Sequence, residues 1–185
     1  LNCKNPTCVE GCPVNINIPG FIKQLEIGNL AAAAEIIAES STLPAVCGRV
    51  CPQEKQCESK CIHLKMGHQP VAIGYLERFV ADNAPKAESG TGNRESKNGK
   101  KIGYEVTVFE ALHEIGGVLK YGIPEFRLPN RIVDKEIDGL RALGVTFQTD
   151  TIIGKTLSIQ DLQDEGFLGI FVGSGAGLPR FMGIP

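Results

Sequence analysis

LPAVCGRVCPQEKQCESKC, residues 43–61, holds four of the seven cysteines in this chain of 185 residues. The other three form an earlier group, Cys3-x4-Cys8-x3-Cys12, and the last two-thirds of the chain contains no cysteine. An odd number of cysteines confined to one third of a chain fits a disulfide framework poorly. Metal binding in a reducing compartment such as the cytoplasm explains the grouping better.

The spacing of the cysteines favours iron–sulfur chemistry. Neither group contains a Cys-x2-Cys pair, which is a common zinc-binding spacing. Closely spaced cysteines followed by proline, as at Cys12-Pro13 and Cys51-Pro52, are typical of iron–sulfur sites. Structural zinc and inert or disulfide-bonded cysteines remain as alternatives. Seven cysteines are too many for one four-cysteine cluster and one too few for two.

The segments between and after the cysteines are expected to be helical. One helix begins near Pro19, a second covers 30–39 behind an Asn29 N-cap, and a third covers about 70–82. Glu77 falls within the apolar stripe of the third helix, and a buried carboxylate needs a partner. An iron atom of a cluster would be such a partner, and a salt bridge to a nearby Arg or Lys is the alternative.

Composition divides the chain into a cysteine-rich region (1–84), an exposed linker (85–101) and a region (102–185) in which strands alternate with a helix. The helix is expected over 131–143, with Gly144 as its stop. The strand candidates are 104–109, 145–147, 152–153 and a buried strand at 168–172. This alternation predicts an α/β layer.

Charge and hydropathy exclude two classes of partner. The net charge is −2 and the sequence pI is about 6.0, so nucleic acid is not an expected partner. No apolar run approaches the roughly 18 residues of a membrane span, so we expect no membrane segment.

Several long runs resemble one family of flavoproteins. They are residues 43–61 together with IPGFIKQLEIGNLAAAAEII (18–37), QPVAIGYLERFV (69–80), GYEVTVFEALHEIGGVLKYGIPEFRLPNRIVDKEI (103–137) and GIFVGSGAGLPRFMGIP (169–185). The family includes the small (beta) subunit of NADPH-dependent glutamate synthase. It also includes the large subunit of NADH-dependent ferredoxin–NADP oxidoreductase and the N-terminal part of dihydropyrimidine dehydrogenase.

The resemblance implies an α-helical iron–sulfur domain followed by a partial α/β (Rossmann-like) FAD-binding domain. It implies two [4Fe–4S] clusters, one held by Cys3, Cys8, Cys61 and a cysteine before Leu1. The other is held by Cys12, Cys51, Cys57 and Glu77. Cys47 is then left over, unless it completes the ligand set in place of the cysteine before Leu1.

The resemblance also implies an oxidoreductase. NADPH or NADH would reduce FAD, and electrons would pass through the two clusters to a partner redox subunit, which the sequence does not identify. The alternative function is a non-enzymatic, zinc-stapled helical module on which a larger subunit docks.

The residues implied at the flavin come from the second half. Glu110, directly after the 104–109 strand, is the candidate ribose ligand, and Arg127 is the candidate charged contact. The candidate glycines are Gly116, Gly117, Gly173, Gly175 and Gly177. The alternative for the last three is that they form an ordinary turn with no contact to the flavin. Only Gly103 separates Lys100-Lys101-Ile102 from Tyr104, which leaves no room for the first strand, glycine-rich loop and helix of a dinucleotide fold. Because the family's nicotinamide-nucleotide domain is also absent before Pro185, we expect this chain to be inactive alone.

Overall fold

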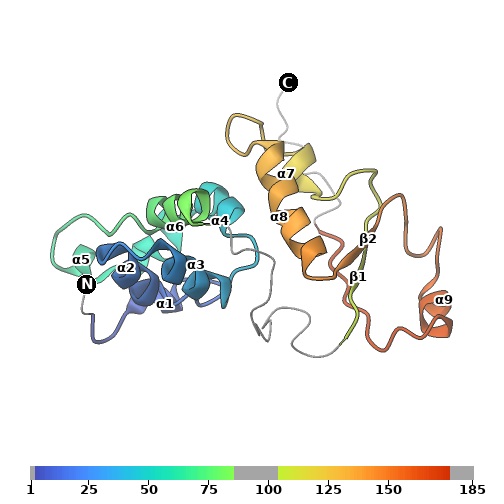
Figure 1. Ribbon diagram of the computed structural model, residues 1–185, viewed down its shortest axis with the longest axis horizontal. Helices are drawn as coiled ribbons and strands as arrows, with labels where there is room; N and C mark the ends of the chain where they lie inside the picture. Colours follow the sequence, from blue (N-terminus) through green and yellow to red (C-terminus); the bar gives the residue numbers. More distant parts are fainter. Residues whose placement is uncertain (1–2, 86–103, 176–185) are drawn as a thin grey trace, which may run out of the picture.

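A computed structural model describes residues 3–85 and 104–175, and these form a helical region and a mixed region (Figure 1). The expected linker, apart from Pro85, lies outside the described residues, as does Gly177. Among the described helices, none has the length and apolar character needed to cross a membrane.

The helical region is built from short helices on which the cysteines are carried. They are α1 (Thr7–Glu10), α2 (Ile18–Glu26), α3 (Leu30–Ala38), α4 (Pro44–Val50), α5 (Ile62–Lys65) and α6 (Ile73–Asn83), with the 3-10 turns η1 (Gln53–Lys55) and η2 (Glu58–Lys60). The three helices expected from the sequence correspond to α2, α3 and α6, with ends shifted by one to three residues.

Asparagine caps start two of these helices. The Asn17 side chain accepts a hydrogen bond from the Gly20 N–H in α2, and Asn29 accepts one from the Ala32 N–H in α3, each at 3.1 Å. The predicted Asn29 cap is therefore confirmed. The core of the region is apolar and includes Phe21 of α2 among its fully buried side chains.

α4 and α6 approach each other so closely that a glycine is required between them. A Cβ atom on Gly48 would lie 2.7 Å from the Arg78 backbone nitrogen. The Arg49 guanidinium extends from α4 to both carboxylate oxygens of Asp82 at 2.8 Å and also donates to the Ala45 carbonyl. These contacts set the Cys47–Cys51 stretch against the helix that carries Glu77.

The mixed region contains two parallel strands joined through helices. β1 (Thr107–Phe109) pairs with β2 (Thr146–Gln148), with Val108 opposite Phe147. The helices are α7 (Val118–Tyr121), α8 (Asn130–Ala142) and α9 (Ile159–Asp164). A strand, a helical crossover and a parallel strand form an α/β unit, which agrees with the expected layer. Gly144 follows the end of α8 with φ of +90°, as the predicted stop requires.

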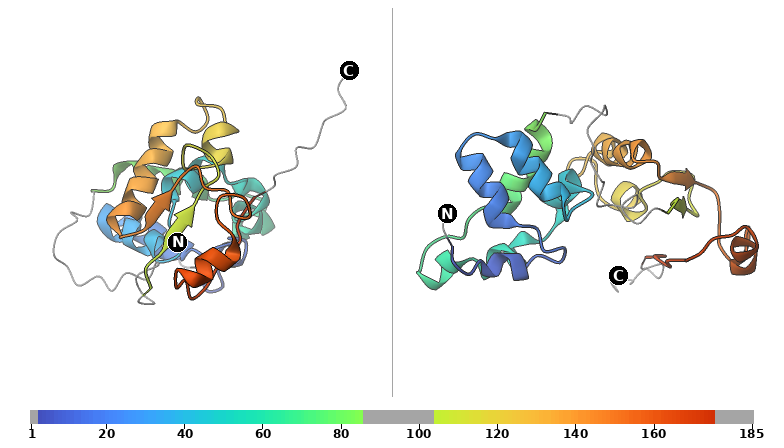
Figure 2. Two further views of the ribbon diagram at one scale, coloured as in Figure 1. Left: turned by 90° about the vertical axis from the view of Figure 1, so that its right-hand side faces the viewer. Right: turned by 60° about the horizontal axis from the view of Figure 1, so that its bottom comes forward.

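The two regions share a small second core. Val46 of α4 is buried with Leu128, Val133 and Ile137 of the mixed region. α4 and α8 accordingly contact each other, and they are neighbours in Figure 1 and in the right view of Figure 2. One of its four buried residues belongs to a helix of the cysteine-rich region, so the regions are packed on each other.

The strands of the mixed region are shorter than the sequence predicts. The predicted buried strand at 168–172 is wrong: Leu168 is 85% exposed and Phe171 is 95% exposed, and the segment has no strand assignment. A strand requires a hydrogen-bonded neighbour, and among the described residues no segment pairs with this one. The expected strand at 152–153 is reduced to a single bridge between Ile153 and Leu157.

Candidate iron–sulfur site

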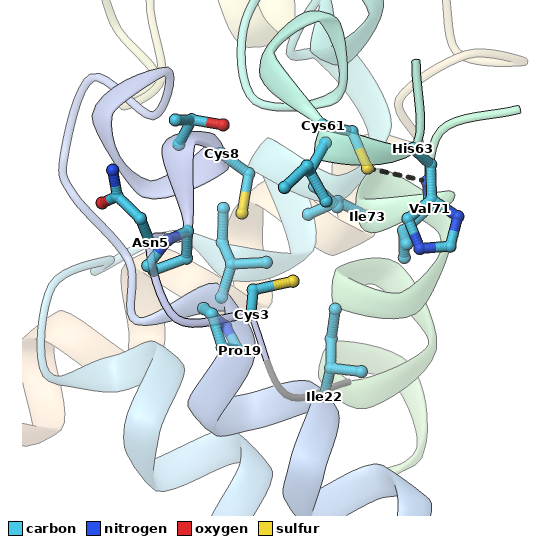
Figure 3. Close-up of a pocket in the computed structure, with 13 residues that line it drawn as sticks. Cys3, Asn5, Cys8, Pro19, Ile22, Cys61, His63, Val71 and Ile73 are labelled. Carbon is cyan, nitrogen blue, oxygen red and sulfur yellow. Dashed lines mark hydrogen bonds between the residues drawn. The ribbon is translucent and has the colours of Figure 1, made fainter. Parts of the chain in front are cut away.

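One pocket of the helical region brings three cysteines together. Cys3, Cys8 and Cys61 line it, and Figure 3 shows their side chains around the same space. We call these three cysteines the first thiol set. The rest of the lining is mostly apolar and includes Ile18, Ile22, Val71 and Ile73. Two cysteines near the start of the described chain and one more than fifty residues later are thus gathered at one mostly apolar pocket.

The thiols of this set affect one another electrostatically. Burial raises the pKa of the Cys8 thiol, and the neighbouring thiols of Cys61 and Cys3 raise it further. The Val71 backbone N–H donates a hydrogen bond to Cys61 Sγ at 3.5 Å (dashed line in Figure 3). Like charges at one place favour the binding of a cation, which would stabilise the thiolates together.

A second group of donors lies where α4 and α6 meet. Cys51 interacts electrostatically with Glu77, Cys12 and Cys57. We call these four residues the second donor set. Burial raises the pKa of Cys57 to about 11, and the charges of Glu58 and Cys12 add to that increase. Cys51 thus interacts electrostatically with the three other residues that the family resemblance implies for the second cluster, and that ligand set stays a prediction.

Glu77 is the unusual member of this set. Its side chain lies on the buried face of α6, the residue is only 6% exposed, and Oε1 has no hydrogen-bond partner among the described residues. Burial, and then the charge of Cys47, raise the pKa of the Glu77 carboxyl to about 8. A buried carboxylate without a partner is costly, and a bound metal would remove that cost.

Cys47 lies beside the second donor set. A hydrogen bond between the Cys47 and Cys51 thiols raises the pKa of Cys47 and lowers that of Cys51. The Ser41 hydroxyl donates to Cys47 Sγ at 3.9 Å. Cys47 is therefore close to a predicted ligand but is itself hydrogen-bonded through its thiol.

The donor chemistry of both sets fits iron–sulfur clusters, since thiolates are their usual ligands and a carboxylate can replace one of them. All seven cysteines are free of disulfides. Within the described ranges, no group of three or more His, Cys, Asp or Glu side chains is arranged to hold a single metal ion.

The sequence did not predict the residues that support these two sets. Gly48 permits the close approach of α4 to α6, and Arg49 fixes it through Asp82. The only sequence signal for this contact is the Gly48-Arg49 pair between Cys47 and Cys51, and cysteine spacing does not include it. The Val71 N–H could not have been predicted, because it depends on a backbone path rather than on a side chain.

The residues predicted for flavin binding are not joined into one site by any hydrogen bond or ion pair within the described part of the chain. Glu110 follows β1 as expected, but its Oε1 accepts from the Leu112 N–H at 3.0 Å. The Arg127 side chain is exposed. The glycines Gly116, Gly117 and Gly175 have φ values of +130°, +50° and +70°, while Gly173 lies in an exposed, irregular segment.

Comparison with known proteins supports the iron–sulfur reading. Residues 1–89 match the family described as dihydropyrimidine dehydrogenase domain II, 4Fe–4S cluster. The chain is 35% identical to the NAD-dependent dihydropyrimidine dehydrogenase subunit PreT of Escherichia coli O157:H7, over 98% of this chain and 49% of that protein. It is 34% identical to the glutamate synthase [NADPH] small chain of Escherichia coli K12, over 92% of this chain and 41% of that protein. The glutamate synthase [NADPH] small chain of Azospirillum brasilense is 31% identical, over 87% of this chain and 38% of that protein.

These matches confirm the resemblance to the glutamate synthase small subunit and to dihydropyrimidine dehydrogenase. The chain spans half or less of the length of these relatives. The match to PreT extends over 207 positions, more than the 185 residues of the chain, so that relative has extra residues inside the matched region. The chain is therefore similar to subunits of iron–sulfur oxidoreductases, and its residues 1–89 match the 4Fe–4S domain of dihydropyrimidine dehydrogenase.

Proposed function

We propose that this chain is the iron–sulfur part of an oxidoreductase subunit of the glutamate synthase small-chain type. The first thiol set, with one further ligand, would hold one [4Fe–4S] cluster, and the second donor set would hold another. The observation that carries the proposal is the buried Glu77 carboxyl group, which has an unpartnered oxygen and lies near the thiols of Cys51 and Cys47.

Bound at these positions, such clusters take up and release single electrons at potentials set by ligand type, hydrogen bonds to sulfur and burial. The chain's own residues control each of these factors. Apolar side chains such as Ile22 and Ile73 keep water from the first thiol set, and the Val71 N–H donates to Cys61. In the second donor set the Glu77 carboxylate replaces a thiolate, so the two sites are expected to differ in potential.

The finer assignments belong to the same proposal. The electron source is NADPH or NADH, the flavin is FAD, and the recipient is a partner redox subunit, such as the large subunit of glutamate synthase, in the cytoplasm. The FAD contacts would come from Glu110, Arg127 and the glycines at 116, 117, 173, 175 and 177. We place the missing glycine-rich segment near Lys101, and PreT has extra residues inside the matched region.

Metal analysis of the full chain tests the proposal. The chain is purified anaerobically, or reconstituted with iron and sulfide, and then assayed for iron, acid-labile sulfide and zinc. We expect a brown protein with iron and sulfide in equal amounts. A colourless protein with stoichiometric zinc would instead support the docking-module alternative.

Glu77 provides a sharper test of the second donor set. Replacement by Gln should change the electron paramagnetic resonance signal of one cluster and leave the other as it is. The control is Glu54→Gln, an exposed carboxylate in η1. Unchanged signals in Glu77→Gln would remove Glu77 from the ligand set. We also expect no oxidation of NADPH by this chain with any acceptor, and turnover would contradict the proposed absence of the glycine-rich segment.

A further inference from the structure

Cys47 is a half-buried thiol that the proposed ligand sets do not use. It belongs to α4 and precedes Cys51, the C-cap residue of that helix, by four residues, which is about one helical turn. Its backbone is fixed as well, because the Gln53 side-chain amide donates to the Cys47 carbonyl at 3.1 Å. A residue held in this way next to a predicted ligand is placed to act on that ligand.

The hydrogen bond from Ser41 indicates toward which neighbour the Cys47 thiol can donate. Ser41 is only 4% exposed, and its hydroxyl donates to Cys47 Sγ at 3.9 Å. Since Cys47 Sγ accepts this bond, its own hydrogen is free to point elsewhere. Cys51 lies one turn further on, because its backbone N–H donates to the Cys47 carbonyl at 3.1 Å, and its thiol is the neighbouring acceptor. The result is a chain of donors from Ser41 through Cys47 to Cys51.

We propose that Cys47 is a positioning residue whose thiol donates a hydrogen bond to Cys51 Sγ and thereby raises the reduction potential of the cluster held by the second donor set. This inference rests on the proposed function. A hydrogen bond to a ligand sulfur stabilises the reduced cluster more than the oxidised one, because reduction adds negative charge to the cluster and its sulfurs. Cys47 thus takes a role other than that of a ligand.

A redox titration of the full chain with dithionite tests this role, with reduction followed by electron paramagnetic resonance. The signal that Glu77→Gln alters identifies the cluster concerned. Cys47→Ala removes the donor, Cys47→Ser keeps one, and Thr42→Ala removes an exposed hydroxyl nearby as a control. If Cys47→Ala does not fold, Cys47→Val fills a similar space without a donor.

In Cys47→Ala the potential of that cluster should become more negative. At the potential where the unmodified cluster is half reduced, its reduced-to-oxidised ratio should fall by a factor of about 2 to 10, the worth of one hydrogen bond. Cys47→Ser and Thr42→Ala should stay close to the unmodified chain, and the other cluster should not change in any variant.

Three results would overturn the inference. They are an unchanged potential in Cys47→Ala, equal shifts in Cys47→Ala and Cys47→Ser, and loss of iron from that cluster in Cys47→Ala, which would make Cys47 a ligand. Failure of the proposed function itself gives a different result, because the unmodified chain would then bind no iron and sulfide.

Discussion

The helical region (3–85) and the mixed region (104–175) are held together in different ways. In the helical region, elements far apart in the sequence meet through close backbone packing and buried contacts, as where Gly48 lies against Arg78. In the mixed region, many of the contacts are local, such as the capping box of α9 and the Arg141–Asp138 pair within α8. The core of the mixed region is completed by Val46 from α4.

This difference indicates where each kind of substitution should have its effect. The second donor set exists because two helices are pressed together, so a change in packing should disturb the donors without removing any of them. The mixed region uses α4 as part of its core, so it should depend on the helical region. Substitutions in the helix caps of the mixed region should destabilise only the helix that carries the cap.

Gly48→Val should have the largest effect. Its side chain would collide with the backbone of Arg78, which cannot move aside as a flexible side chain can, and α4 would be forced away from α6. We expect a loss of about 3 kcal/mol or more in unfolding free energy. We also expect a loss of about half of the bound iron, since one of two clusters would lose its ligand geometry.

Iron analysis and urea denaturation measure these effects. The matched control is Gly139→Ala in α8, where an added Cβ meets nothing within 4 Å. Replacement of a helical glycine by alanine at such an open position should be neutral or stabilising. Full iron binding by Gly48→Val would show that the second donor set does not depend on this contact.

Val46→Ala tests whether the mixed region depends on α4. The side chain is 4% exposed and packs in the core shared with Leu128, Val133 and Ile137. Loss of two methyl groups there should cost about 1–3 kcal/mol. Hydrogen exchange should show reduced protection of the α8 amides, and Val14→Ala, at a residue 48% exposed, is the control. Protection lost only in α4 would contradict the shared core.

The fold was predictable from the sequence where signals are local. The Asn29 cap, the Gly144 stop and the position of Glu77 on the buried face of α6 all followed from spacing. The strand at 168–172 was not predictable in this way, because an apolar run shows a tendency to be buried and does not reveal whether a neighbouring strand exists.

The candidate site was predictable to a similar extent. Spacing singled out the cysteines, and the family resemblance supplied their division into two sets. In the structure Cys3, Cys8 and Cys61 line one pocket, and the division into ligand sets stays a prediction. The contacts that position them depend on tertiary packing, as with Arg49 and Asp82, thirty-three residues apart. No local pattern in the sequence encodes such a contact.

Glu136→Ala should have an intermediate effect at the junction of the two regions. Its Oε1 accepts a hydrogen bond from the Ala45 N–H at 2.8 Å, in the first turn of α4, where N–H groups lack helical partners. Removal of this acceptor should cost about 1 kcal/mol in urea denaturation. Glu136→Gln, which keeps an oxygen acceptor, should lose less than Glu136→Ala, and equal losses would show that the hydrogen bond is not the cause.

Asp161→Asn should have the smallest effect and should depend on pH. Asp161 and Ser158 form the capping box of α9, and the Ser158 backbone N–H, followed by its hydroxyl, lowers the pKa of the Asp161 carboxyl below its ordinary value of 3.8. A carboxyl with a lowered folded-state pKa stabilises the fold above its ordinary pKa, and this contribution is lost as the pH falls through the folded-state pKa. Denaturation curves of Asp161→Asn and the unmodified chain should therefore differ near neutral pH and converge at strongly acidic pH.

Asp164→Asn, which removes a carboxylate of α9 outside the capping box, should not show this convergence. A constant difference at every pH would mean that the substitution acts through packing and that α9 is held by more than its local cap.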